Sequence, residues 1–145
     1  MNIATPRHDA DLPIWREAVT ASLNGLHDTT SARTTTIDAT PVVIMSVPIL
    51  SGTVALFEWT ILARQSAGSG TVGDGAVYVG VVAAHLVGGT ATIIGSGATL
   101  LTVEDDSSWA ASVAGSGNQL QWTITGASGK TIGWRIDVRS RRIAV

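Results

Sequence analysis

The sequence contains no cysteine, which excludes disulfide frameworks, thiolate nucleophiles and cysteine-based zinc sites. Charged residues are scarce, at 14% of the chain, whereas an ordinary soluble domain has about 25%. Lys130 is the only lysine, and phenylalanine and tyrosine occur once each. The formal net charge of −2 gives no basic surface for nucleic acid, so we expect no nucleic-acid partner. So little charge does not favour a soluble monomer, and we expect an oligomer.

Long apolar runs are also missing. Residues 76–87 form the most apolar stretch, which is shorter than the roughly 18 residues of a membrane-spanning helix. The opening residues MNIATPRHDADLP have no apolar core of a secretory signal. We therefore expect no membrane association and synthesis in the cytosol.

Small and β-branched residues dominate what is present, with 16 glycines among 145 residues. This length fits one domain with a short appendage. Residues 31–145 alternate β-type segments with glycine-rich turns, a pattern typical of sandwiches, jelly rolls and small barrels. We predict a mainly β fold: an antiparallel β-sandwich or jelly-roll-like domain of about eight or nine strands.

Residues 1–30 differ in composition and predict a polar leader followed by a short amphipathic α-helix. Asp11 can cap the start of the helix, and Pro13 suits its first turn. Apolar residues at spacings of three and four form one stripe. A helix this short is marginal alone, so the stripe is expected to dock on a partner or assist oligomerisation. The stripe consists of Leu12, Trp15, Val19, Leu23 and Leu26.

Two predicted strands near the end, 120–125 and 131–138, alternate apolar and polar residues. The short segment 126–130 between them predicts a hairpin.

Two longer predicted strands, 54–63 and 76–87, are apolar on both faces, unlike a sheet with one face in water. A short helix cannot cover both strands, so a subunit interface is the preferred explanation. The residues chosen for this interface are Phe57, Trp59, Val77, Val79 and Val81.

Glycine-rich pieces at 68–70, 73–75, 95–97 and 115–117 are not followed by the Lys-Ser/Thr of a phosphate-binding loop. Turns explain them better. No G-x-S-x-G nucleophile elbow is present either.

Metal ligands are equally poorly spaced. The acidic run 104–106 with Asp74 could offer oxygens to calcium, but its consecutive spacing is more typical of a solvated turn. His8, His27 and His85 show no metal-binding spacing. We therefore predict no metal, no cofactor and no catalytic residue.

Glu58 lies in the middle of a predicted strand beside Trp59. A lone carboxylate there is more often an interface or edge residue than a catalyst. A glycan depolymerase would need a second pocketed carboxylate, for which Glu104 is a candidate without obvious pairing. An enzyme is therefore improbable.

Tryptophan offers the largest flat apolar face for stacking a sugar ring. Trp122 and Trp134 fall on the buried alternation, and Trp15 falls on the helix stripe. Trp59 and Trp109 remain as surface candidates.

Positive charge gathers near the end of the sequence, where two interpretations stay open. The arginines could form a solvated strand face, or they could dock on an acidic patch of a partner. The residues are Arg135, Arg139, Arg141 and Arg142.

Three segments resemble structural proteins of tailed bacteriophage particles of the capsid decoration (cement), head-fibre or short tail-fibre type. They are LPIWREAVTASLNGL (12–26), TTTIDATPVVIMSVPI (34–49) and LQWTITGASGKTIGWRIDV (120–138). The resemblance implies a homo-oligomer, often a trimer, that attaches to major capsid or other virion proteins through its N-terminal part. It also implies a location on the virion surface after assembly in the host cytoplasm.

The main hypothesis is thus a non-enzymatic capsid decoration or head-fibre protein that stabilises the particle. The alternative is a phage receptor-binding or carbohydrate-binding module that recognises a host-surface glycan. Its site would comprise Trp59, Trp109, Tyr78 and the loop 66–75.

Overall fold

The computed structural model describes residues 27–144, which form nine strands, every pair antiparallel. This confirms the mainly β, antiparallel class and the expected number of strands. No helix occurs within these residues, and the helix predicted before them lies outside the described part. The strands are β1 (His27–Thr36), β2 (Val42–Pro48), β3 (Thr53–Gly68), β4 (Gly75–Val87), β5 (Thr90–Ile93), β6 (Ala98–Glu104), β7 (Ala110–Ser116), β8 (Gln119–Thr125) and β9 (Lys130–Ala144).

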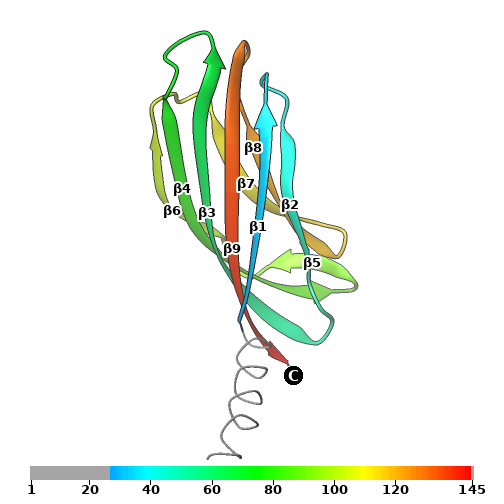
Figure 1. Ribbon diagram of the computed structural model, residues 1–145. Helices are drawn as coiled ribbons and strands as arrows, with labels where there is room; N and C mark the ends of the chain where they lie inside the picture. Colours follow the sequence, from blue (N-terminus) through cyan, green and yellow to red (C-terminus); the bar gives the residue numbers. More distant parts are fainter. Residues whose placement is uncertain (1–26, 145) are drawn as a thin grey trace, which may run out of the picture.

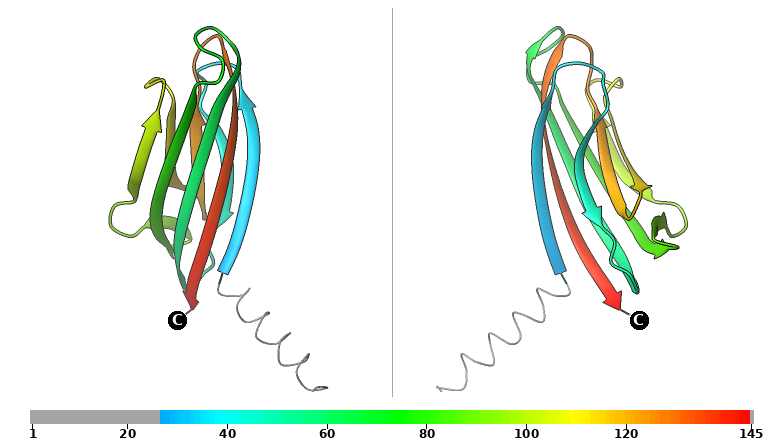
Figure 2. Two further views of the ribbon diagram at one scale, coloured as in Figure 1. Left: turned by 60° about the vertical axis from the view of Figure 1, so that its left-hand side comes forward. Right: turned by 90° about the vertical axis from the view of Figure 1, so that its right-hand side faces the viewer.

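The strands form two sheets that lie face to face (Figures 1 and 2). Sheet A has the order β1-β9-β3-β4-β5, with β6 also paired to β4. Sheet B has the order β2-β8-β7. The first and last strands are therefore neighbours, and β9 runs between β1 and β3.

The core lies between the sheets and is built from alternate residues of each strand. Sheet A contributes Phe57 and Ile136, and sheet B contributes Trp122 and Ile124, all fully buried. The rings of Phe57 and Trp122 meet edge to face with centroids 5.8 Å apart, which joins the two layers.

The predicted hairpin between the last two strands is wrong. β8 pairs with β2 and β7 in sheet B, whereas β9 pairs with β1 and β3 in sheet A. The alternation identified the buried face of each strand, but both sheets turn such a face inward. Residues 126–129 instead cross between the layers, and Gly126 packs so closely on Thr36 that a side chain would overlap it.

The polar residues 27–31 belong to β1. β1 is an edge strand of sheet A, and its residues 28–31 are exposed. Such a strand has no apolar alternation, so hydrophobicity could not reveal it. β1 also crosses the boundary expected between residues 30 and 31.

Candidate functional site

The face of sheet A that points away from sheet B is the most unusual surface of the described chain. We call it the outer face. On β3, Phe57 and Ile61 turn into the core, whereas Leu56 and Leu62 turn outward and are 37% and 43% exposed. On β4, Val79 likewise lies on the outer face and is half-buried.

Part of the outer face, over β3, β4 and β6, is nearly free of charge, and we call it the apolar half. Its side chains come from rows of directly paired residues, such as Leu62–Val77–Val103. A contiguous exposed apolar surface of this kind marks an interaction site in a soluble protein. Its members are Leu56, Leu62, Val77, Val79, Val81, Leu100, Leu101 and Val103.

β6 is exposed to an unusual degree. It pairs only with β4, and each of its residues except Glu104 is exposed. Leu100 and Leu101 lie where the register of β6 against β4 shifts, and they are 64% and 46% exposed. An exposed apolar edge strand is a template for association with another chain.

The other part of the outer face, over β1 and β9, carries charge, and we call it the arginine half. Arg135 pairs with Asp137 at 3.1 Å, and Arg141 lies 3.9 Å from Glu58. The Ser31 hydroxyl donates a hydrogen bond to Asp137, and this bond, followed by Arg135, lowers the pKa of the Asp137 carboxyl.

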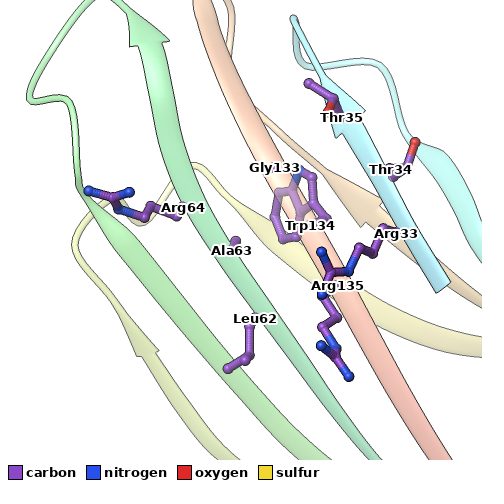
Figure 3. A pocket seen from close by; sticks show the side chains of 9 residues that line it. All are labelled: Arg33, Thr34, Thr35, Leu62, Ala63, Arg64, Gly133, Trp134 and Arg135. Atoms are coloured by element: carbon purple, nitrogen blue, oxygen red, sulfur yellow. The ribbon is translucent and has the colours of Figure 1, made fainter. Parts of the chain in front are cut away.

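A hollow of about 540 Å³ lies in this half, where Gly133 leaves room on β9 (Figure 3). Arg33, Arg64 and Arg135 surround it from three adjacent strands. The guanidinium of Arg64 points away from the other two (Figure 3). Within residues 27–144, Arg33 and Arg64 have no carboxylate partner.

A second hollow, of about 480 Å³, lies further along the same face. Its walls include Glu58, Thr60, Asp137 and Arg139, with Leu100 on the apolar side. The two carboxylates share this hollow, but each contacts an arginine. A general acid for glycoside cleavage needs a raised pKa, and that of Asp137 is lowered.

The acidic turn after β6 is committed to local contacts. Glu104 accepts a hydrogen bond from the Tyr78 hydroxyl at 2.7 Å, and Asp105 accepts one from the Gly75 N–H at 2.8 Å. Asp106 accepts from Lys130 at 2.6 Å. Among residues 27–144, no three His, Asp or Glu side chains come together as a metal site.

Two pKa values follow from these contacts. The Lys130 ammonium, helped by Ser108, holds the pKa of Asp106 well below its usual range. Burial raises the pKa of Tyr78, and the hydrogen bond to Glu104 raises it further.

The residues predicted to form the subunit interface fall into two groups in the structure. Val77, Val79 and Val81 lie on the outer face and are half-buried, and their role in an interface stays a prediction. Phe57 and Trp59 are corrected: at 0% and 2% exposure they pack within the chain. They follow the same two-residue period as Ile61, and that period places them inside.

The site proposed for a sugar is likewise corrected. Trp59, Trp109 and Tyr78 are at most 3% exposed, so none offers a ring face to a ligand. Trp109 and Tyr78 instead pack on Trp134, with ring centroids 6.1 and 6.5 Å away. The residues of the predicted helix stripe lie outside the described part of the chain: Leu12, Trp15, Val19, Leu23 and Leu26.

The predicted arginines do not form one patch. Arg135, Arg139 and Arg141 are exposed and lie on the outer face at alternate positions of β9, whereas Arg142 is opposite Ala55 and only partly exposed. Arg33 and Arg64 were missed because each is isolated in the sequence. Only the pairing of β1, β9 and β3 brings them to one hollow.

The part of the chain that the structure describes contains no helix with the length and hydrophobicity needed to span a membrane.

No family model matches the chain, and no curated protein matches it. Among solved structures, it is similar to the tailspike protein of Acinetobacter phage vB_ApiP_P1, with a TM-score of 0.47 and 15% identity over 82% of this chain. It is also similar to the tailspike of Acinetobacter baumannii phage AM24, with a TM-score of 0.49 and 9% identity over 78% of this chain. A third is the tailspike gp49 of Acinetobacter baumannii bacteriophage Fri1, described as a capsular polysaccharide depolymerase, with a TM-score of 0.42 and 13% identity over 82% of this chain. The chain spans 22%, 26% and 19% of these proteins.

Proposed function

We propose that this chain is a non-enzymatic structural subunit of a tailed-phage particle that works as a homo-oligomer, with a trimer favoured. The observation that carries the proposal is the apolar half of the outer face. Leu100 and Val103 are 64% and 56% exposed there, beside half-buried Val77, Val79 and Val81. The phage assignment and the trimer come from the sequence resemblance.

Self-association explains this face in physical terms. Each apolar side chain removed from water contributes roughly 25 cal/mol per Å² buried, and the scarcity of charge on β4 and β6 keeps the opposing desolvation cost low. A structural role also suits the carboxylates: Asp106 and Asp137 have lowered pKa values and support loops and strands. Attachment through residues 1–26 to capsid or other virion proteins, at the virion surface, belongs to the same proposal.

The test is the solution mass of the full chain by light scattering. We expect a mass of about three times 14.9 kDa, and a monomer for Val79→Glu, which places like charges in the centre of the apolar half. Val43→Glu is the matched control, because Val43 is 47% exposed on β2 of sheet B. A wild-type monomer would contradict the proposal.

A second candidate function is a phage receptor-binding or carbohydrate-binding module. The two hollows of the outer face favour it, since arginine and threonine side chains line both of them. Binding of acidic and neutral oligosaccharides, followed by calorimetry, tests it with Arg33→Ala as the matched variant. Binding that is lost in Arg33→Ala while the oligomer persists would favour this second function.

A further inference from the structure

The pairing of strands arranges opposite charges at the two ends of the same rows. One row of directly opposed residues runs Arg33–Arg135–Leu62–Val77–Val103 across sheet A. The next row runs from Thr35 through Gly133 and Arg64 to Gly75, where the Asp105 N–H donates to the Gly75 carbonyl at 3.0 Å. One end of these rows is therefore rich in arginine, and the other end is apolar and acidic.

Two arginines at one end and two carboxylates at the other lack partners of opposite sign. Within the described residues, Arg33 and Arg64 form no ion pair, and the Glu104 and Asp105 carboxylates accept hydrogen bonds only from uncharged groups. Unpaired charges of opposite sign at two ends of one surface cannot meet within a single chain. They can meet between two chains.

We propose that the acidic edge of one copy, formed by β6 and residues 104–105, docks on the arginine half of the next copy. A rotation about an axis parallel to the strands leaves each row at its own height. Val103 and Asp105 then come level with Arg33, Arg135 and the hollow at Gly133 of the neighbouring copy. This inference rests on the proposed self-association and specifies its contact.

The contact joins two different surfaces, so it is head-to-tail and closes into a ring when the rotation closes. In that ring the outer faces turn toward the common axis, and the valines at 77, 79 and 81 pack around it. Complementary charge fixes which edge meets which, while the apolar half supplies the buried area. The exposed edge strand β6 is covered, which removes a template for uncontrolled association.

The test introduces a positive or a negative charge at the same position, Val103, in two separate variants. Val103 is 56% exposed, donates no side-chain hydrogen bond and shares a row with Arg135, so both variants should fold. Val103→Lys faces the arginines of the next copy and should weaken association at least about tenfold, whereas Val103→Glu should keep the oligomer. Light scattering over a dilution series at low salt measures both, with far-UV circular dichroism to verify folding.

A charge exchange provides the second arm. Arg33→Glu alone and Asp105→Lys alone should each weaken association, and the double variant should restore it to within about threefold of the wild type. Ser112→Glu on exposed β7 is the control for added charge.

The outcomes separate this contact from the proposed function. A wild-type chain that is monomeric overturns both. An oligomer that tolerates Val103→Lys and Val103→Glu equally, or loses both equally, overturns the docking of β6 on the arginine half but leaves self-association in place. If the double variant Arg33→Glu/Asp105→Lys formed a dimer instead of a larger ring, that result would overturn the head-to-tail arrangement.

Discussion

At Gly80, one missing side chain determines how β3, β4 and β6 pack. A Cβ at this position would overlap the indole of Trp59 and lie 2.7 Å from the Ala98 carbonyl oxygen. The glycine is required by close approach and not by an unusual backbone angle, because its φ is not positive. Trp59 is buried at 2% exposure because the space above Gly80 accepts its ring.

Gly80→Ala should therefore lower the free energy of unfolding by about 1–3 kcal/mol, the range for overpacking a core. Gly97→Ala is the matched control, because its Cβ would meet Val82 at an ordinary 3.4 Å. Urea unfolding followed by tryptophan fluorescence measures both. Equal stability of the two variants would show that the indole moves aside without cost.

The contact of Asp106 with Lys130 makes stability depend on pH. The pKa of Asp106 is lowered in the folded state from an ordinary value of 3.8, so the folded protein holds the charged form better than the unfolded chain does. The stabilisation is complete above the ordinary value and is lost as the pH falls through the lowered one.

Asp106→Asn should be less stable than the wild type near neutral pH, and the difference should shrink as the pH falls below about 3. Thermal unfolding at a series of pH values measures this. Asp105→Asn is the control, since the N–H of Gly75 can donate to the amide oxygen of asparagine as it does to Asp105. A constant difference between Asp106→Asn and the wild type at all pH values would contradict the assigned ion pair.

At the scale of elements, the link between β8 and β9 behaves as packed structure and not as an exposed turn. Gly126 and Ala127 are buried, and the Lys130 N–H donates to the Ala127 carbonyl at 3.3 Å. By contrast, side chains added at Gly88 or Gly89, in the turn between β4 and β5, would meet nothing within 4 Å.

Inserting Gly-Ser after Gly126 should therefore lower the melting temperature by about 3–4 °C or more, which corresponds to a loss of about 1 kcal/mol in a chain of this size. The same insertion after Gly88 should change it by no more than about 2 °C. Differential scanning calorimetry distinguishes the two. Equal tolerance would support the hairpin that the sequence pattern predicted.

The same elements show what a sequence can and cannot predict here. Period-two alternation correctly assigned the buried faces of β8 and β9, with Trp122 and Trp134 inside, because burial and periodicity are local properties. It could not assign strand partners, which depend on contacts far apart in the chain, such as His27 with Arg141. The arginine hollow was missed for this reason, whereas the first half of β1 was missed because it has no apolar alternation.

Apolar character on both faces of β3 and β4 led to two different conclusions. Val77, Val79 and Val81 were predicted to form a subunit interface; they lie half-buried on the outer face, and the interface stays a prediction. For Phe57 and Trp59, the cover is sheet B of the same chain. A sequence cannot separate these cases, because a buried face has the same composition whichever chain covers it.

At the scale of the whole molecule, packing between sheets A and B stabilises a single chain. We expect a further contact, between the outer faces of neighbouring copies, to complete the oligomer. The core between the sheets contains Trp109, Trp122, Phe57 and Trp134 at no more than 2% exposure. The apolar half of the outer face has no such cover within residues 27–144. Folding and assembly should therefore be linked.

The melting temperature of the full chain should consequently rise with protein concentration, because association stabilises the folded state by mass action. For a trimer, a tenfold increase in concentration changes the association term by about 0.9 kcal/mol per chain, two thirds of the roughly 1.4 kcal/mol of one tenfold step, which corresponds to a shift of roughly 3 °C in a chain of this size. Val79→Glu should melt at one temperature over the same concentrations, whereas Val43→Glu should follow the wild type. If wild type and Val79→Glu both melted independently of concentration, the outer face would be a stable surface of a monomer, and its two hollows would become the better guide to what the protein binds.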